Sequence, residues 1–209
     1  MKQGLLIILS GPSGVGKGVL RRKIMKDKDL NLTFSISMTT RPKRIKETNG
    51  KDYFFVNQEE FERRIAQGDF IEYVKYCDHY YGTPKGFVDE KLKAGKNVLL
   101  EIEVEGATKV LKQYRGMYTL AVFLLPPNLQ ELERRIRLRN SETDDEIAER
   151  IKQAQEEMKL KDEYDVCLTN YTVKKTAIRL KQSIMNRLNY INAVETGGDV
   201  PKEYTIKRP

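Results

Sequence analysis

The chain has 209 residues and a formal net charge of +8, with 33% charged and 39% hydrophobic residues. No apolar run approaches the roughly 18 residues that would cross a bilayer, and two cysteines, Cys77 and Cys167, are too few for a disulfide scaffold. The composition therefore excludes a transmembrane protein, a disulfide-built domain and a disordered chain. A single histidine, His79, excludes a histidine-pair site. The basic balance predicts an anionic partner, and two thiols fit the reducing cytoplasm.

The first part of the chain alternates apolar strands with amphipathic helices and then becomes polar and basic. Leu5 to Leu9 is continuously apolar, which is typical of a strand buried on both faces of a parallel sheet. The elements expected after it are a glycine-rich turn over 11–18, a helix over 19–27, a strand over 32–37, a polar stretch over 41–52, a strand over 53–56, a helix over 59–67, a strand over 70–76 and a short strand around Tyr81.

A second strand–helix rhythm follows Gly95 and predicts the fold class. Its expected elements are a strand over 97–103, a helix over 106–114, a strand over 118–125, a charged helical stretch over 131–163, a strand over 165–169, a helix over 173–191 and a loose tail over 193–209. Repeated strand–helix units favour an α/β fold with a doubly wound parallel sheet. The stretches near 38–90 and 129–163 do not fit this rhythm, and we interpret them as a small β-rich insertion and a helical one.

The glycine-rich turn matches the phosphate-loop pattern G-x-x-x-x-G-K. Such a loop directs successive backbone N–H groups at an anion, and its lysine places a cation against the terminal phosphates of a nucleotide. A tight strand–helix turn is the alternative. The candidate ATP-binding residues here are Gly11, Pro12, Ser13, Gly14, Val15, Gly16, Lys17 and Gly18. Gly18 stands where the motif usually has a Ser or Thr that ligates Mg²⁺. We therefore expect no direct protein ligand at that point and a metal held through phosphates, waters and an acid elsewhere.

The basic stretch from Thr39 to Val56 is the second candidate site. Arg41 and Arg44 could each grip an anion with two hydrogen bonds. Glu47 and Tyr53 add polar contacts. Taken alone, the stretch is more typical of a solvated basic loop.

Together, these motifs resemble the guanylate kinase family. The resemblance extends from Leu5 to Ile191. Its motifs, in order, are the phosphate loop, Thr39-Thr-Arg41 with Arg44, Glu47, Gly50, Tyr53 and Phe55, then Phe70-Ile-Glu72, Tyr80-Tyr-Gly-Thr83, Leu100-Glu-Ile-Glu103 followed by Gly106, Pro126-Pro127, and arginines 135, 139 and 150. The family transfers the γ-phosphoryl of ATP to GMP with Mg²⁺. The resemblance implies a core (1–37, 96–128, 164–192), a GMP-binding insertion (38–95), a lid (129–163) and a flexible tail (193–209).

The resemblance also implies which residues bind GMP. Arg41, Arg44, Tyr53 and Tyr81 are expected to clamp its phosphate, and Ser37, Glu72 and Thr83 to contact guanine. Glu72 suits this role because a carboxylate can accept from both N1–H and N2–H₂ of guanine, whereas adenine presents an acceptor at N1. The remaining expected GMP-binding residues are Glu47, Glu101 and Glu103. Glu103 stands where the family often has Asp, and its expected contact is either guanine or a water on Mg²⁺. No residue is identified that reads the 2′-hydroxyl, so dGMP is a second expected acceptor.

For the donor side, the resemblance implies that Lys17 and the loop amides hold the ATP phosphates. Arg135 and Arg150 are expected to stabilise the transferred group, and Arg41 to bridge both nucleotides. Arg139 and Asn170 are further expected ATP contacts. The alternative for the lid arginines is pairing with acids on the helix surface, which contributes little.

Three rival functions remain open at this stage. A related domain without catalysis could bind phosphorylated peptides through the same clamp, and ATP turnover separates the two. The basic charge could serve nucleic acid, but the bases are spread along the chain without a known binding motif. A different nucleoside monophosphate could be the acceptor, although Glu72 argues against AMP. We expect no specific nucleic acid and no membrane as partner, and the sequence leaves monomer or homodimer open.

Overall fold

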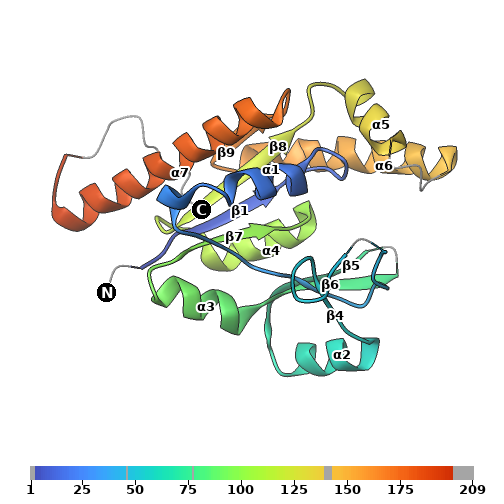
Figure 1. The fold of residues 1–209 in the computed structure, drawn as a ribbon, viewed down its shortest axis with the longest axis horizontal. Coiled ribbons are helices and arrows are strands. Elements are labelled where there is room, and N and C mark those ends of the chain that lie inside the picture. The colour runs from blue at the N-terminus through green and yellow to red at the C-terminus, as the bar shows by residue number, and fades with distance from the viewer. Residues whose placement is uncertain (1–2, 46, 77, 139–142, 200–209) are drawn as a thin grey trace.

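The computed structural model describes residues 3–45, 47–76, 78–138 and 143–199. At its centre is a five-stranded sheet in the order β2-β7-β1-β8-β9 (Figure 1). Every neighbouring pair in this sheet is parallel. The strands are β1 (Leu6–Ser10), β2 (Leu32–Phe34), β7 (Asn97–Glu101), β8 (Thr119–Leu125) and β9 (Val166–Thr169). The predicted parallel α/β sheet is confirmed.

Helices cover both faces of this sheet because its strands are apolar on both sides. Side chains alternate between the two faces along β1: Ile7 and Leu9 pack in one core cluster, and Leu6 and Ile8 pack in the other. The first cluster contains the buried faces of α1 (Lys17–Ile24) and α7 (Val173–Thr196), and the second those of α3 (Lys85–Lys93) and α4 (Val104–Tyr114). Figure 1 shows these two helix layers on opposite sides of the sheet.

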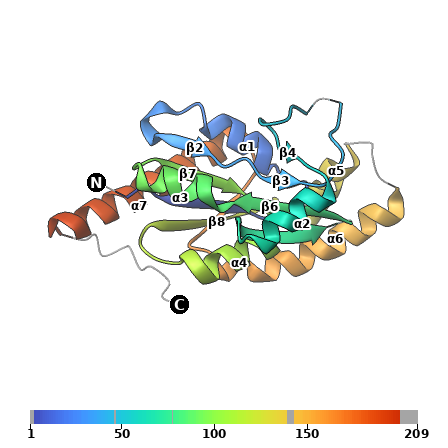
Figure 2. The ribbon, with the colours of Figure 1, turned by 90° about the horizontal axis from the view of Figure 1, so that it is seen from below.

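A second, four-stranded sheet has the order β4-β3-β6-β5. Its strands are β3 (Met38–Thr39), β4 (Phe54–Phe55), β5 (Phe70–Tyr76) and β6 (His79–Pro84), and α2 (Gln58–Ala66) covers it (Figure 2). Phe61 of α2 is fully buried, with ring centroids 4.5 Å from Phe70 and 5.2 Å from Tyr80. This aromatic stack joins helix and sheet into one small unit beside the main sheet.

The charged stretch after β8 forms α5 (Leu129–Arg137) and α6 (Asp144–Lys159), followed by a 3-10 turn, η2 (Leu160–Glu163). The side chain of Asn128 caps α5, and Thr143 and Glu146 form a capping box on α6. The sequence predicts a solvated, weakly apolar segment. The structure differs, because a narrow apolar stripe on each helix is buried in the main core, namely Leu132, Ile136, Ile147 and Ala154.

The predicted bounds differ from the structure in a few places. The sequence pattern does not predict α3, because only Val88 and Leu92 mark its buried face, which packs in the second core cluster. The expected strands over 32–37 and 97–103 end earlier, at Phe34 and Glu101. A short 3-10 turn, η1, lies at Lys28–Leu30.

The C-terminal helix is longer than predicted. α7 continues from Val173 to Thr196, so residues 193–196 of the expected loose tail are helical. It ends at Gly197, whose φ of 69° is the left-handed conformation that favours glycine at a helix end. Residues 200–209 of the predicted tail lie outside the described residues. Over the described ranges, none of the helices is long and apolar enough to cross a membrane. Cys167 is exposed, with its Sγ 3.4 Å from the carbonyl oxygen of Lys161, and Cys77 lies outside the described residues.

Candidate active site

The phosphate loop joins the end of β1 to the start of α1, and its glycines are required there. Gly11, Gly14 and Gly16 have φ of 139°, 85° and 106°, which L side chains rarely adopt. Space is equally tight: a Cβ at Gly11 would stand 2.3 Å from the carbonyl oxygen of Leu124, and one at Gly16 would stand 2.7 Å from Nδ2 of Asn170. The loop therefore curls as an anion-binding turn at the N-terminus of α1.

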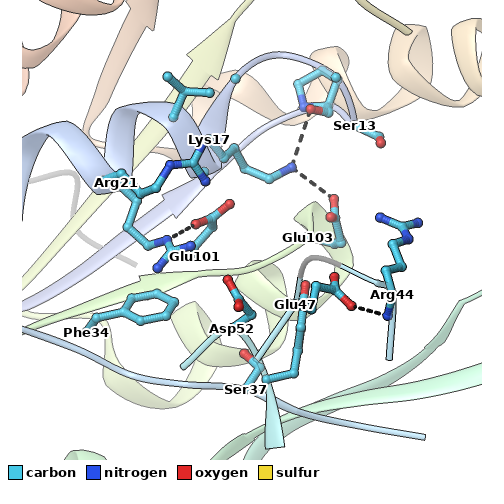
Figure 3. A pocket seen from close by; sticks show the side chains of 17 residues that line it. Ser13, Lys17, Arg21, Phe34, Ser37, Arg44, Glu47, Asp52, Glu101 and Glu103 are labelled. Atoms are coloured by element: carbon cyan, nitrogen blue, oxygen red, sulfur yellow. Dashed lines mark hydrogen bonds and ion pairs between the residues drawn. The ribbon is translucent and has the colours of Figure 1, made fainter. Parts of the chain in front are cut away.

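Lys17, the first residue of α1, directs its side chain back into this loop. Its side chain is only 8% exposed, and its Nζ donates to the carbonyl oxygens of Gly11 and Pro12. The same Nζ lies 3.1 Å from Oε2 of Glu103, the residue that precedes α4 (Figure 3). The ammonium group of Lys17 thus lies at the mouth of the loop. In this structure Glu103 supplies the negative charge beside it that a bound phosphate would otherwise supply.

Arginines from α5 and α6 reach the loop, as the sequence predicts. Arg135 donates to the carbonyl oxygens of Val15, at 3.1 Å, and Asn170, at 3.0 Å, and it pairs with Glu131. Nη1 of Arg150 lies 3.2 Å from Oγ of Ser13. The structure therefore brings the loop and these two arginines together. Arg139 lies outside the described residues.

Asn170 is hydrogen-bonded to the backbone of the phosphate loop. It is 2% exposed, its Nδ2 donates to the Val15 carbonyl at 2.9 Å, and its Oδ1 accepts from the hydroxyl of Thr176. Both ends of the amide are thus engaged with protein groups. These bonds give the side chain a role in fixing loop geometry, and the expected adenine contact stays a prediction.

The basic stretch after β3 forms a compact charged cluster. Nη2 of Arg41 lies 2.7 Å from Oε1 of Glu47, whose Oε2 accepts from the backbone N–H of Arg44 at 2.8 Å. The Arg41 guanidinium lies 5.5 Å from the Tyr53 ring centroid, and Tyr53 meets Tyr81 edge-on. Burial opposes ionisation of Glu47, but Arg41 and Arg44 outweigh it and lower its pKa. Glu47 thus compensates the arginine in this structure, where the sequence predicts that Arg41 spans two phosphates.

The carboxylate of Glu72 lies in a small pocket that Tyr53 and Tyr81 of this cluster also line. Glu72 is 6% exposed, and its Oε1 accepts from the hydroxyl of Thr83 at 2.6 Å. Burial raises its pKa to about 7, although Thr83 and Lys109 act in the opposite direction. The pocket has a volume of about 30 Å³. Its lining includes five other predicted GMP-binding residues, Ser37, Tyr53, Tyr81, Glu101 and Glu103.

Glu101 and Glu103 lie where this small pocket meets a larger cavity of about 580 Å³, and both line both spaces. Glu101 pairs with Nε of Arg21 at 2.7 Å, and burial raises its pKa. A Cβ at Gly18 would stand 3.2 Å from Glu101 Oε1. The larger cavity is also lined by loop residues 12–14 and 16–18 and by Ser37, Arg44, Glu47 and Tyr53. The phosphate loop and part of the predicted acceptor site therefore line one cavity, while Glu72 and Tyr81 line only the adjoining small pocket.

Several residues of this site are not identified from the sequence. Arg21 follows Lys17 by one helical turn, which is a usable signal, and it stacks 4.1 Å from the ring centroid of Phe34 on the cavity wall. Glu157 of α6 gives no signal, because it belongs to a charged helix. Its burial and the charge of Glu103 raise its pKa to about 7, while Lys17 opposes the change. It brings a further carboxylate close to the Lys17–Glu103 pair.

A protein-only metal site is absent from the part of the chain that the structure describes: no three His, Cys, Asp or Glu side chains are grouped to hold an ion. Glu101 and Glu103 nevertheless offer carboxylate oxygens beside the loop, which are the ligand type that Mg²⁺ prefers. Any such ion would need phosphate oxygens and water to complete its shell.

Comparison with known proteins assigns the family. A sequence model described as guanylate kinase matches residues 3–187. The chain is 44% identical over 187 residues to a guanylate kinase of Malacoplasma penetrans, covering 90% of this chain and 95% of that one. It is 46% identical over 183 residues to one of Streptococcus thermophilus, covering 88% and 87%. The solved structure of guanylate kinase from Anaplasma phagocytophilum matches with a TM-score of 0.73 at 30% identity, over 88% of this chain and 86% of that one. With the phosphate loop, the arginine cluster and the Glu72 pocket in the expected places, these matches show that the chain belongs to the guanylate kinase family.

Proposed function

We propose that this protein transfers the γ-phosphoryl of ATP to GMP, giving ADP and GDP, and that dGMP is a second acceptor. The observation that carries this function is the shared cavity of about 580 Å³, which the phosphate loop lines on one side and Ser37, Arg44 and Tyr53 line on the other. A donor phosphate on the loop and an acceptor phosphate on the clamp would face each other there. Membership of the guanylate kinase family supports the same reaction. The presence of only two cysteines fits a reducing compartment, which supports a cytoplasmic location.

Guanine recognition is assigned to the Glu72 pocket. An ionised Glu72 can accept from N1–H and N2–H₂ of guanine, while Thr83 and Ser37 complete the polar edge. Adenine would oppose its N1 lone pair to this carboxylate and leave buried groups unpaired, which disfavours AMP by roughly 10⁴ or more. None of the residues assigned to the site reads the 2′-hydroxyl, which is why dGMP is included.

The GMP phosphate is assigned to Arg41, Arg44, Tyr53 and Tyr81. Glu47 lies 2.7 Å from Arg41 and supplies the negative charge that this cluster needs. We infer that the phosphate takes over part of that compensation when GMP binds. Burial raises the pKa of Tyr53, so its hydroxyl keeps its proton and can donate a hydrogen bond to the phosphate.

On the donor side, the loop amides and Lys17 are assigned to the β- and γ-phosphates of ATP, and Arg135 and Arg150 to the transferred group. An oxygen of the GMP phosphate forms a bond to the γ-phosphorus as the bond to the ADP oxygen breaks. Such a transfer needs in-line placement and neutralised charge rather than a covalent catalyst. Residues 129–163 would act as a lid that excludes water, with Arg139 as a further ATP contact.

Mg²⁺ fits this site without a hydroxyl ligand from the loop. Gly18 has no side chain, and the space beside it is reached by Glu101, whose Oε1 lies 3.2 Å from the position of a Cβ. Glu101 and Glu103 would hold the ion together with phosphate oxygens and water. When bound, Mg²⁺ neutralises charge on the β- and γ-phosphates. The groups of the protein that bind and orient the phosphates are the phosphate loop, the clamp on the GMP phosphate, and Arg135 and Arg150.

Product analysis tests this function. The protein is incubated with ATP, Mg²⁺ and GMP, and nucleotides are separated and quantified over time. The expected result is ADP and GDP in equal amounts, abolished in Lys17→Ala and retained in Lys23→Ala, a matched change at an exposed lysine of the same helix. ADP without GDP would indicate an ATPase instead. Absence of turnover together with binding of a phosphorylated peptide would favour the non-catalytic binding domain.

A further inference from the structure

The carboxylate of Glu72 is confined between β6 and the first turn of α4. Thr83 of β6 holds Oε1 at 2.6 Å. The other oxygen, Oε2, lies against Gly106, the third residue of α4. A Cβ built on Gly106 would stand 2.6 Å from Oε2 and 3.1 Å from the carboxylate carbon. Because real Cβ atoms do not approach an oxygen so closely, any other residue at 106 would displace Glu72.

The backbone does not explain a glycine at this position. Gly106 lies inside a helix and is not among the glycines with positive φ, so an alanine could adopt its conformation. Glycine in a helix costs about 1 kcal/mol relative to alanine, through backbone entropy. Gly106 is also buried, so it gains nothing from solvation. A residue that destabilises its own helix is expected to be needed for a contact outside that helix. At Gly106 that contact is with the Glu72 carboxylate, which fills the space a Cβ would take.

We propose that Gly106 is a specificity-determining position, which leaves room for the Glu72 carboxylate to stand where it can accept from the guanine edge. This inference rests on the proposed function and adds a positioning residue to it. Gly106 itself carries no group that could touch the base. Its effect passes through Oε2 of Glu72, whose other oxygen Thr83 already fixes, so that displacement by a methyl group must turn the carboxylate away from its present direction.

The proposal predicts that Gly106→Ala weakens GMP binding without lowering the stability of the fold. Because the obstructing atoms belong to the far end of a flexible side chain, the fold can absorb the methyl group by moving Glu72. Alanine has a higher helix propensity than glycine, so the melting temperature of the variant is expected to equal or exceed that of the wild type. GMP binding is expected to weaken about tenfold or more, since a hydrogen bond to a charged group is lost or misdirected. ATP binding, which depends on the phosphate loop, is expected to stay within about twofold.

Gly86 supplies the matched control. It lies in α3, also lacks positive φ, and nothing stands within 4 Å of the position of its Cβ. Gly86→Ala therefore makes the same chemical change in a helix without touching the site. Equilibrium dissociation constants for GMP and ATP are measured by calorimetry for the wild type, both alanine variants, Glu72→Ala and the double variant Gly106→Ala/Glu72→Ala, together with KM, kcat and melting temperature.

The expected pattern is a weaker GMP complex in Gly106→Ala, wild-type GMP binding in Gly86→Ala, and no further loss when Gly106→Ala is added to Glu72→Ala. Equal GMP affinity in Gly106→Ala and Gly86→Ala would overturn the inference, as would losses that add in the double variant. If Gly106→Ala fails to fold, the double variant must fold, because it lacks the atoms that the methyl group meets; its failure would also overturn the inference. Wild-type protein that neither binds nor phosphorylates GMP would instead refute the proposed function.

Discussion

Replacing Glu72 by glutamine should stabilise the folded protein at neutral pH while weakening GMP binding. Burial raises the pKa of Glu72 to about 7, whereas the unfolded chain loses this proton near 4.5. Between these values the folded chain holds more protons than the unfolded one. The free energy of unfolding therefore falls as pH rises from about 4.5 to about 7, and the loss is complete above that range. The difference between the two pKa values corresponds to about 3 kcal/mol.

A glutamine side chain cannot ionise, so the Glu72→Gln variant avoids this cost. Urea unfolding at pH 8 should show the variant to be more stable by up to about 3 kcal/mol, and at pH 4.5 the two proteins should agree within about 1 kcal/mol. Glu59→Gln, at an exposed glutamate of α2, should show no such dependence. A stability difference for Glu72→Gln that is the same at both pH values would refute the reasoning, because it would not follow the titration of a buried carboxyl.

The same titration governs GMP binding, since only the ionised carboxylate accepts from both guanine donors. With a pKa of about 7, the ionised fraction falls by about tenfold between pH 8 and pH 6, and GMP affinity should fall with it. The phosphate of GMP also titrates, near pH 6. Glu72→Gln shares that second titration, so the ratio of wild-type to variant affinity isolates Glu72. A ratio that does not change with pH would count against its role as the guanine acceptor.

Three further changes have distinct expected results. Lys17→Ala should lower kcat by about a hundredfold or more, because it removes the cation at the loop; a loss below about tenfold in steady-state kinetics would argue against that role. Gly18→Ser should leave kcat and the Mg²⁺ requirement within about threefold, since Glu101 already reaches that space; a tenfold gain at lower Mg²⁺ would contradict it. Arg187→Met should cost about 3–5 kcal/mol in urea unfolding, because it leaves Asp165, now 3.3 Å from the guanidinium, as an unpaired and largely buried charge. Partial recovery in Arg187→Met/Asp165→Asn is expected, and equal loss in both would contradict the pairing.

The main sheet is predictable because its strands carry their own signal. Runs such as 5–9 and 120–125 are apolar at every position, which matches strands buried on both faces. The pattern misses β3 because two residues show no periodicity, and its place is set by pairing with β4 and β6. It misses α3 because two buried residues are too few to define a stripe. The buried face of α5 and α6 escapes prediction because charge dominates those helices.

The site is predictable to the extent that its motifs are local. The phosphate loop and the stretch over 39–56 each present their functional residues within one short segment. The ion pairs between Lys17 and Glu103 and between Arg21 and Glu101 join positions that lie far apart in the sequence, so only the fold reveals them. The same is true of Gly106 in α4, because the need for glycine there depends on the space taken by an oxygen atom of Glu72 in β5.

The central claim is guanine-specific phosphoryl transfer, and an acceptor panel tests it most directly. ADP formation from ATP and Mg²⁺ is measured with GMP, dGMP, AMP, CMP and UMP offered separately, for wild type and Glu72→Gln. The account predicts turnover with GMP and dGMP only, a kcat/KM for GMP at least about 10⁴ above that for AMP, and a much smaller preference in Glu72→Gln. Turnover with AMP at a rate comparable to GMP in the wild type would contradict it.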